Sequence, residues 1–137
     1  KKYPGVPSIN LHTIHPHEHL KIGDFDITPF QVMHDKLPIL GYKINNLAYI
    51  TDMKTIADEE VELIKGVDIL VENALRWDKP HHSHQLVGDA VNFARRVGAK
   101  HTYLVHANHD IGKHDDINKR LPDDIRYAYD GQVLLCP

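Results

Sequence analysis

The stretch VDILVENALRWDKPHHSHQLVGDAVNFARRVGAKHTYLVH, residues 67–106, predicts a strand, a helix and a second strand in that order. Residues 67–72 are a short apolar run between polar residues, which is typical of a buried strand. Apolar side chains recur at helical spacing over residues 84–97, and Gly98 follows as a helix stop. Residues 100–106 return to a strand pattern. This alternation indicates a mixed α/β layer architecture.

The flanking segments add an antiparallel block before this unit and a short tail after it. Residues 9–51 are mostly strand-like, beginning with the alternating residues 8–14, and hairpins are predicted at Gly23-Asp24 and Asn45-Asn46. Further helices are predicted at residues 55–66 and 113–122, and a final hairpin at residues 125–137 around Asp130-Gly131. No linker or internal repeat interrupts this order, which predicts a single domain over residues 1–137.

The composition is that of an ordinary globular protein. The 137 residues are 42% hydrophobic and 26% charged, with a net charge of −3 when the histidines are neutral. The basic residues do not cluster, which argues against duplex DNA as a partner. No apolar run reaches the about 18 residues of a membrane helix, which argues against a membrane partner. The single cysteine, Cys136, cannot form an internal disulfide, which favours a cytoplasmic location.

Candidate site residues stand at the ends of four predicted strands. His34 ends one strand, Asp52 follows another, and His106 ends the strand at residues 100–106. His84 lies in the loop after the strand at residues 67–72, just before a helix. In open α/β folds, sites gather at the carboxyl ends of strands, where loops converge. Three imidazoles and one carboxylate are the donor set of a zinc or manganese site.

Each of these residues also has an ordinary structural explanation. A lone histidine at a strand end is commonly solvated or caps a chain turn. Asp52 precedes a predicted helix, where an aspartate often serves as the N-cap. The four residues at equivalent strand ends together favour a site, but their spacing alone does not decide between the two interpretations.

Residues 12–19, HTIHPHEH, hold four of the twelve histidines but do not meet the strand-end criterion. In a strand, His15, His17 and His19 would share one face, yet Pro16 interrupts the run. We interpret this segment as an exposed, polar edge of a hairpin. The alternative is adventitious binding of metal at the surface.

Around the candidate residues the chain resembles the C-terminal half of the metallo-β-lactamase-fold hydrolases. It is most similar to the branch with the carbon–phosphorus lyase accessory phosphodiesterase PhnP, and more distantly to the endonuclease tRNase Z. Residues 25–44 resemble the strand of the third histidine motif, LAYITD at residues 47–52 resembles the bridging-aspartate motif, and residues 67–131 resemble the rest. The resemblance over residues 67–131 is fairly specific to this family, whereas LAYITD alone is weak evidence for it. The resemblance implies an α/β fold, the C-terminal half of an αββα sandwich with a mixed sheet flanked by helices.

The resemblance also implies a metal centre with two divalent ions, zinc or manganese. His34 matches a ligand of the first metal, Asp52 matches the aspartate that bridges both metals, and His106 matches a ligand of the second metal. Both ions would share a bridging hydroxide that attacks phosphorus, with its pKa lowered toward 7 by the metals.

Three further residues take roles from the same resemblance. His84 matches a histidine near the scissile phosphate that is not a ligand, and this position implies a catalytic acid for the leaving oxygen. His109 matches a second histidine that we place on the substrate side or just behind the metal ligands. Glu72 falls where the family often has an acid after the strand, and is expected to orient His84 as an outer-shell residue.

One family motif is absent from the sequence. His-x-His-x-Asp-His, the signature that supplies further ligands from the N-terminal half, does not occur, and residues 15–20 fail it because His19 and Leu20 replace aspartate and histidine. We therefore expect residues 1–137 to be the C-terminal part of a metallo-β-lactamase-fold domain whose N-terminal half is absent. That half is then a required partner, the isolated chain is expected to be inactive, and a homodimer is left open.

The implied function is metal-dependent hydrolysis of a small phosphodiester, with cyclic phosphodiesters included. Two alternatives stay open. One is a non-catalytic metal-binding or interaction module, in which the histidines are structural or scavenge metal. The other keeps the fold and makes the protein an RNA 3′-end nuclease, although the weak basic character argues against this substrate.

Overall fold

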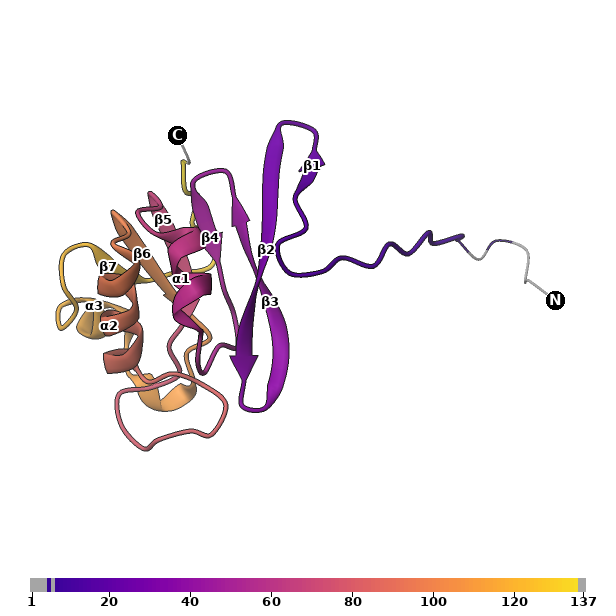
Figure 1. The fold of residues 1–137 in the computed structure, drawn as a ribbon. Coiled ribbons are helices and arrows are strands. Elements are labelled where there is room, and N and C mark those ends of the chain that lie inside the picture. Colours follow the sequence, from indigo (N-terminus) through magenta and orange to yellow (C-terminus); the bar gives the residue numbers. More distant parts are fainter. Residues whose placement is uncertain (1–4, 6, 136–137) are drawn as a thin grey trace.

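Seven strands form one mixed sheet in the computed structural model, which describes residue 5 and residues 7–135 (Figure 1). Their order across the sheet is also their sequence order: β1 (Leu20–Ile22), β2 (Phe25–His34), β3 (Leu37–Ile44), β4 (Leu47–Tyr49), β5 (Ile69–Asn73), β6 (His101–Val105) and β7 (Ile125–Tyr127). Neighbours from β1 to β4 pair antiparallel, and neighbours from β4 to β7 pair parallel. The predicted α/β class with a mixed sheet is confirmed.

Two helices, α1 (Asp58–Ile64) and α2 (Val87–Val97), cover one face of the sheet, while η1 (His109–Ile111) and α3 (His114–Asn118) follow β6 (Figure 1). The helix predicted around α2 forms because its apolar positions fall on one buried side. Gly98 ends it in the left-handed conformation, with φ of 69°, as the sequence predicts. None of the helices in the described residues has the length and apolar character needed to cross a membrane.

The hydrophobic core lies between these helices and the sheet. From the sheet it includes Phe30, Leu70, Leu104 and Ile125, each 0% exposed. From the helices it includes Val61, Ile64, Val87, Ala90, Phe93, Ala94 and Val97. Burying a large apolar side chain stabilises the fold by about 1.5–3 kcal/mol. The core therefore fixes the strands, and with them the strand ends that hold the candidate residues.

The opposite face of the sheet carries a row of aromatic and apolar side chains. The register places Tyr42 beside Tyr49, Tyr49 beside Val71, and Val71 beside Tyr103. Cross-strand partners share a face, and these positions alternate along their strands with core residues. Tyr49 is 44% exposed. No helix of the described residues covers this face in Figure 1.

Gly41 on β3 leaves room for the ring of Phe30, its partner on β2. A Cβ at residue 41 would lie 2.7 Å from two ring atoms of Phe30 and 3.3 Å from Ile50. Because the core is close-packed, the ring cannot move away freely. We expect Gly41→Ala to lower the free energy of unfolding by about 1–3 kcal/mol, measured by urea denaturation. Gly88→Ala is the control, since its Cβ would meet nothing within 4 Å; equal stability of the two variants would contradict the prediction.

Both early hairpins form as predicted. Ile22 pairs with Phe25 across Gly23-Asp24. Ile44 pairs with Leu47 across Asn45-Asn46, where Asn45 takes a φ of 50°.

Two predicted strand segments are wrong. Residues 8–14 form no strand, and Ile9 and Leu11 are 76% and 90% exposed, because alternation does not form a strand without an adjacent strand to pair with. The turn at Asp130-Gly131 forms, but in the described residues up to 135 no strand returns along β7. Instead Leu134 lines a pocket together with Ile69 and Tyr103, so tertiary contacts with β5 and β6 replace the hairpin.

Candidate metal centre

Asp52, His84 and His106 form a cluster whose metal-ligating atoms all lie within 4.8 Å of one another. Oδ1 of Asp52 lies 3.2 Å from Nε2 of His84 and 3.4 Å from Nδ1 of His106. The two imidazole rings stack, with centroids 4.6 Å apart and planes at 17°. One carboxylate oxygen is therefore shared by two histidines from different segments of the chain.

His34 adds a fourth side chain to this cluster. Its ring lies 4.9 Å from that of His84 in an edge-on arrangement, and its Nδ1 is 2.7 Å from the carbonyl oxygen of Asp52. Because a carbonyl only accepts, Nδ1 must carry the proton in this hydrogen bond. In the neutral ring the lone pair is then on Nε2, which is the nitrogen available to a metal.

The sheet brings these residues to one edge because their strands run in the same direction. His34 is the last residue of β2, and His106 follows β6 directly. Asp52 follows β4, and His84 lies between β5 and α2. Two antiparallel pairings orient β2 like β4, and β4, β5 and β6 are parallel, so all four carboxyl ends lie at the same edge. The strand-end criterion thus finds residues that the fold brings together.

The backbone of the site is in an unusual conformation at two of the four residues. Asp52 has a φ of 59° and His106 a φ of 62°, both in the left-handed region. Residues other than glycine seldom adopt this region, and the cost is on the order of 1 kcal/mol per residue. Such conformations persist only where surrounding contacts hold them, and they are concentrated at functional sites.

His84 is nearly enclosed, with its side chain 13% exposed. Burial lowers the pKa of His84, the nearby His106 and His34 lower it further, and the hydrogen bond with Asp52 opposes the shift. On the other side of the ring, Nδ1 of His84 lies 3.1 Å from both Oγ of Ser83 and Nδ1 of His81. The ring is therefore held on both nitrogens.

Glu72 does not contact His84 as predicted but its neighbour Gln85. Nε2 of Gln85 donates to Oε2 of Glu72 at 3.2 Å, while Oε1 has no hydrogen-bond partner among the described residues. Glu72 is fully buried, and burial raises the pKa of this carboxyl well above its usual range. The contact is displaced by one residue along the loop because His84 turns toward Asp52 instead.

His109 lies outside the cluster. It begins the turn η1 after β6, its side chain is 91% exposed, and its Nε2 is 3.3 Å from the carboxylate of Asp110. Its predicted place on the substrate side is not supported by a contact with Asp52, His84 or His106 in the described residues.

The histidine-rich residues 12–19 lie before β1, where nearly all of them are exposed. His17 makes a long-range contact, with Nε2 2.9 Å from Oε1 of Glu60 on α1. Residues 12–19 contribute nothing to the ligand cluster of the described part of the chain. The contact of His17 with Glu60 joins the N-terminal segment to α1.

Two residues that the sequence did not single out support the site. Asn73, at the end of β5, bonds to both backbone groups of Met53, and Nζ of Lys54 donates to the carbonyl of His84 at 3.1 Å. The available signal was the pair Glu72-Asn73 at the end of an otherwise apolar strand. Asparagine is depleted in strands, so its presence there indicates a specific hydrogen-bonding role.

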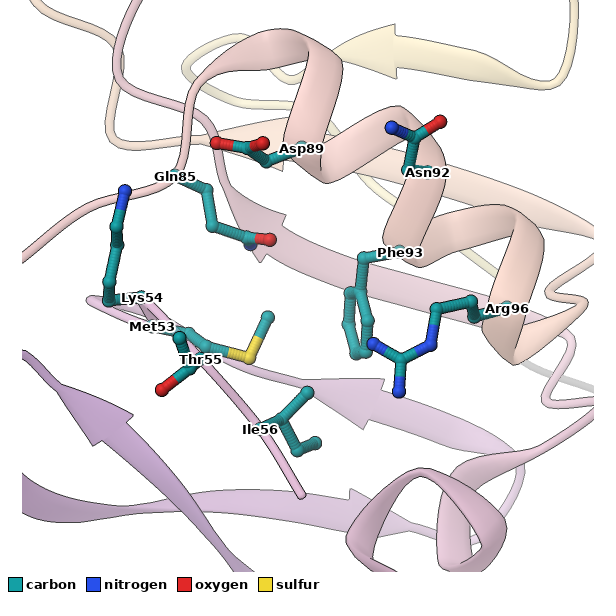
Figure 2. Close-up of a pocket in the computed structure, with 9 residues that line it drawn as sticks. All are labelled: Met53, Lys54, Thr55, Ile56, Gln85, Asp89, Asn92, Phe93 and Arg96. Atoms are coloured by element: carbon teal, nitrogen blue, oxygen red, sulfur yellow. The ribbon is translucent and has the colours of Figure 1, made fainter. Parts of the chain in front are cut away.

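A pocket of about 350 Å³ lies beside the cluster, between α2 and residues 53–56 (Figure 2). Met53 and Gln85 line it, and they are the chain neighbours of Asp52 and His84. Lys54 and Arg96 stand at opposite sides of the pocket in Figure 2. None of the four cluster residues lines it, so the candidate chemistry lies at the edge of the sheet and not in this pocket.

The residues present fit a divalent metal ion. Imidazole nitrogens and a carboxylate oxygen are the ligands of zinc and manganese, and here those of Asp52, His84 and His106 converge, with the ring of His34 beside that of His84. The tautomer of His34 leaves Nε2 free to coordinate, and its Nδ1 hydrogen bond to a carbonyl is the usual orienting contact of a metal-binding histidine.

Comparison with known proteins gives one family description, the Beta-lactamase superfamily domain, which matches residues 1–107. A protein of Porphyromonas gingivalis named octanoyltransferase is 39% identical over 129 residues, which are 94% of this chain and 26% of that protein. The chain thus spans about a quarter of this curated relative, which is a much longer protein.

Solved structures extend the comparison. A diphosphatase from the PhnP family is 37% identical, with a TM-score of 0.84 over 90% of this chain and 47% of its own. YhfI from Bacillus subtilis and human tRNase Z, short form, are each 20% identical, with TM-scores of 0.70 and 0.67 over 85% and 86% of this chain. The last two likenesses show the fold alone. The chain spans about half the length of these structures, 47%, 52% and 44% in turn.

Proposed function

Because the chain belongs to the β-lactamase superfamily and has the metallo-β-lactamase fold, we propose that it supplies part of the active site of a metal-dependent phosphodiesterase. The observation that carries this proposal is the convergence of Asp52, His84 and His106 at one edge of the sheet, with His34 beside them. Members of this fold family typically bind divalent metals, and these residues offer the ligands that such metals need.

His34 through Nε2, Asp52 through its carboxylate and His106 through an imidazole nitrogen would hold the metal ions, zinc or manganese, two in the complete site. When bound, a divalent ion supplies a Lewis acid and lowers the pKa of a water molecule toward 7. The hydrogen bond between Nδ1 of His34 and the carbonyl of Asp52 orients the ring of His34 relative to the segment of Asp52.

His84 is the residue of the chain that would serve the leaving group. Its Nε2 faces the carboxylate oxygen of Asp52 at 3.2 Å, so this nitrogen is beside any phosphate bound at the cluster. From there it can donate a proton or a hydrogen bond to the oxygen that departs from phosphorus. Contacts of Ser83 and His81 with Nδ1 restrict rotation of the ring, which keeps Nε2 directed toward the site.

A phosphorus-centred substrate is supported by the 37% identity with a diphosphatase of the PhnP family. Hydrolysis of a phosphodiester and of a diphosphate share the same events, attack of water on phosphorus and departure of an oxygen. The substrate we propose is a small phosphodiester, and a diphosphate linkage is the nearest variant.

We further propose that residues beyond these 137 complete the site and cover the open face of the sheet. The solved relatives are about twice as long as this chain. The row of Tyr42, Tyr49, Val71 and Tyr103 leaves aromatic surface on that face, with Tyr49 44% exposed, which suits packing against a second layer.

The proposed function is tested with the full-length protein and a panel of substrates. Bis-p-nitrophenyl phosphate, a cyclic nucleotide and a dinucleoside diphosphate are compared with p-nitrophenyl acetate and an acyl thioester, each with and without EDTA. We expect hydrolysis of phosphorus substrates that EDTA abolishes and added zinc or manganese restores. Thioester hydrolysis at a comparable rate would contradict the substrate class. Bound metal with no turnover of any substrate would favour the non-catalytic module.

A further inference from the structure

Residues 52–54 form a hub that contacts every other segment of the site. The carbonyl of Asp52 accepts from His34 on β2. Met53 is held by Asn73 of β5, and the side chain of Lys54 reaches the loop of His84. Three successive residues are thus fixed by three different elements.

The contact with Asn73 uses both ends of the side-chain amide. The N–H of Met53 donates to Oδ1 of Asn73 at 2.7 Å, and Nδ2 of Asn73 donates to the carbonyl of Met53 at 2.9 Å. Asn73 is 0% exposed and Met53 is 1% exposed, so water does not compete for these bonds. Since a backbone N–H can only donate, the orientation of the amide is fixed by its partners.

The same asparagine is linked to the segment of His106. On the sheet Asn73 is the partner of Val105, the residue just before His106, and the N–H of Ala74 donates to the carbonyl of Val105 at 2.9 Å. The end of β5 therefore lies between the two segments whose ligand residues adopt left-handed φ values, Asp52 and His106. It is placed to hold both.

Lys54 makes a separate contact with the catalytic side of the site. Its Nζ donates to the carbonyl of His84 at 3.1 Å. Figure 2 shows the Lys54 side chain extending from the hub along the pocket toward the segment that precedes α2. This bond concerns the backbone of His84 and leaves both ring nitrogens to their own partners.

From these contacts we infer that Asn73 is the positioning residue for the metal-binding carboxylate of Asp52, and that Lys54 is the positioning residue for His84. This inference rests on the proposed function. Asn73 holds the backbone next to Asp52, whose φ of 59° lies in the left-handed region that aspartate adopts infrequently. Lys54 fixes the loop from which His84 reaches the same site. The two residues serve different parts of the reaction, so their loss has different consequences.

Asparagine is the residue that meets both requirements at position 73. Aspartate in its place would still accept from the N–H of Met53, but it would place an oxygen against the Met53 carbonyl. Alanine would leave both buried backbone groups without a partner, which is destabilising in itself. Asn73→Asp therefore removes the donor with the least change in shape, and Asn73→Ser keeps one hydrogen bond.

The experiment measures three quantities in the full-length protein: the dissociation constant for zinc by competition with a chelator, the Tm of the metal-free protein, and kcat. We expect Asn73→Asp to weaken zinc binding about 10- to 100-fold, with Asn73→Ser between it and the wild type. The matched control is Asn92→Asp, the same chemical change at an exposed position of α2, which should leave zinc binding unchanged.

Lys54→Met is expected to lower kcat without changing the dissociation constant for zinc, and Lys54→Arg to restore kcat because it again offers a donor. Lys36→Met, in the exposed turn after β2, is the control. Wild-type zinc affinity in Asn73→Asp, with or without a lower Tm, would overturn the role of Asn73. A parallel loss of zinc affinity in Lys54→Met would overturn the separation of roles. Absence of metal binding in the wild-type protein would instead refute the proposed function.

Discussion

Asp52→Asn is expected to remove tightly bound metal from the full-length protein and to lower phosphodiester turnover by at least about 100-fold. This loss is larger than the one caused by replacing a residue that only hydrogen-bonds to a metal ligand. The carboxylate is the only anionic group in the cluster, and its Oδ1 lies within 3.4 Å of nitrogens of two histidines. An amide oxygen is neutral and a weak ligand for zinc or manganese, so the ions would lose their shared partner. Elemental analysis after gel filtration and turnover of bis-p-nitrophenyl phosphate are the measurements.

Asparagine is the informative replacement because Asp52 has a φ of 59°. Asparagine tolerates the left-handed region better than alanine, so the loss reports on the carboxylate and not on backbone strain. The matched control is Asp35→Asn, since Asp35 has a φ of 54° but lies exposed in the turn between β2 and β3. Asp52→Asn with the metal content of the wild type would refute the assignment of Asp52 as a ligand.

His84→Ala is expected to lower turnover about 100- to 10,000-fold while the metal content stays the same. Turnover should fall because the variant loses Nε2 of His84, which faces the cluster. The metal content should stay the same because Asp52, His34 and His106 remain to bind metal. The effect should be larger for an alkyl leaving group, which needs a proton as it departs, than for p-nitrophenolate, which does not. Comparing an alkyl and a nitrophenyl diester therefore separates acid catalysis from a general disturbance of the site.

His82→Ala is the control for this variant, because His82 lies exposed in the same loop, two residues before His84. Loss of metal in step with turnover would make His84 a ligand, which its place within 4.8 Å of the other donors permits. Equal effects on the alkyl and nitrophenyl diesters would contradict the acid role even if metal were retained.

Much of this fold could be predicted from the sequence because its elements depend on local patterns. The apolar periodicity and Gly98 define α2, and Asn45-Asn46 defines a hairpin. The prediction of a hairpin after Asp130-Gly131 is wrong for the described residues, up to residue 135, for a tertiary reason. Asp130-Gly131 does turn the chain, but the following residues find contacts near β5 and β6 in preference to β7. The sequence around the turn does not indicate which of these two sets of contacts the chain will make.

The site was predictable to the extent that it depends on strand direction. His34, Asp52, His84 and His106 follow strands that run the same way, so the strand ends mark them as candidates, although a ligand role follows only from the family resemblance. The partners of these residues were not predictable in this manner. Whether Glu72 reaches His84 or Gln85 depends on the path of one loop, and the bonds between Asn73 and Met53 join residues 20 apart in sequence. Such contacts leave no periodic pattern in the sequence, so they can be identified only in the three-dimensional structure.

The order of the strands has a consequence for how this chain folds. β1 to β7 lie in the sheet in the order in which they are synthesised, so each new strand is added at the edge left by the one before it. Each strand from β2 to β7 finds its preceding neighbour already synthesised, and the pairings from β1 to β4 close across short turns. Contacts between nearby segments form quickly because little loop entropy is lost. The sheet can therefore assemble strand by strand as the chain leaves the ribosome.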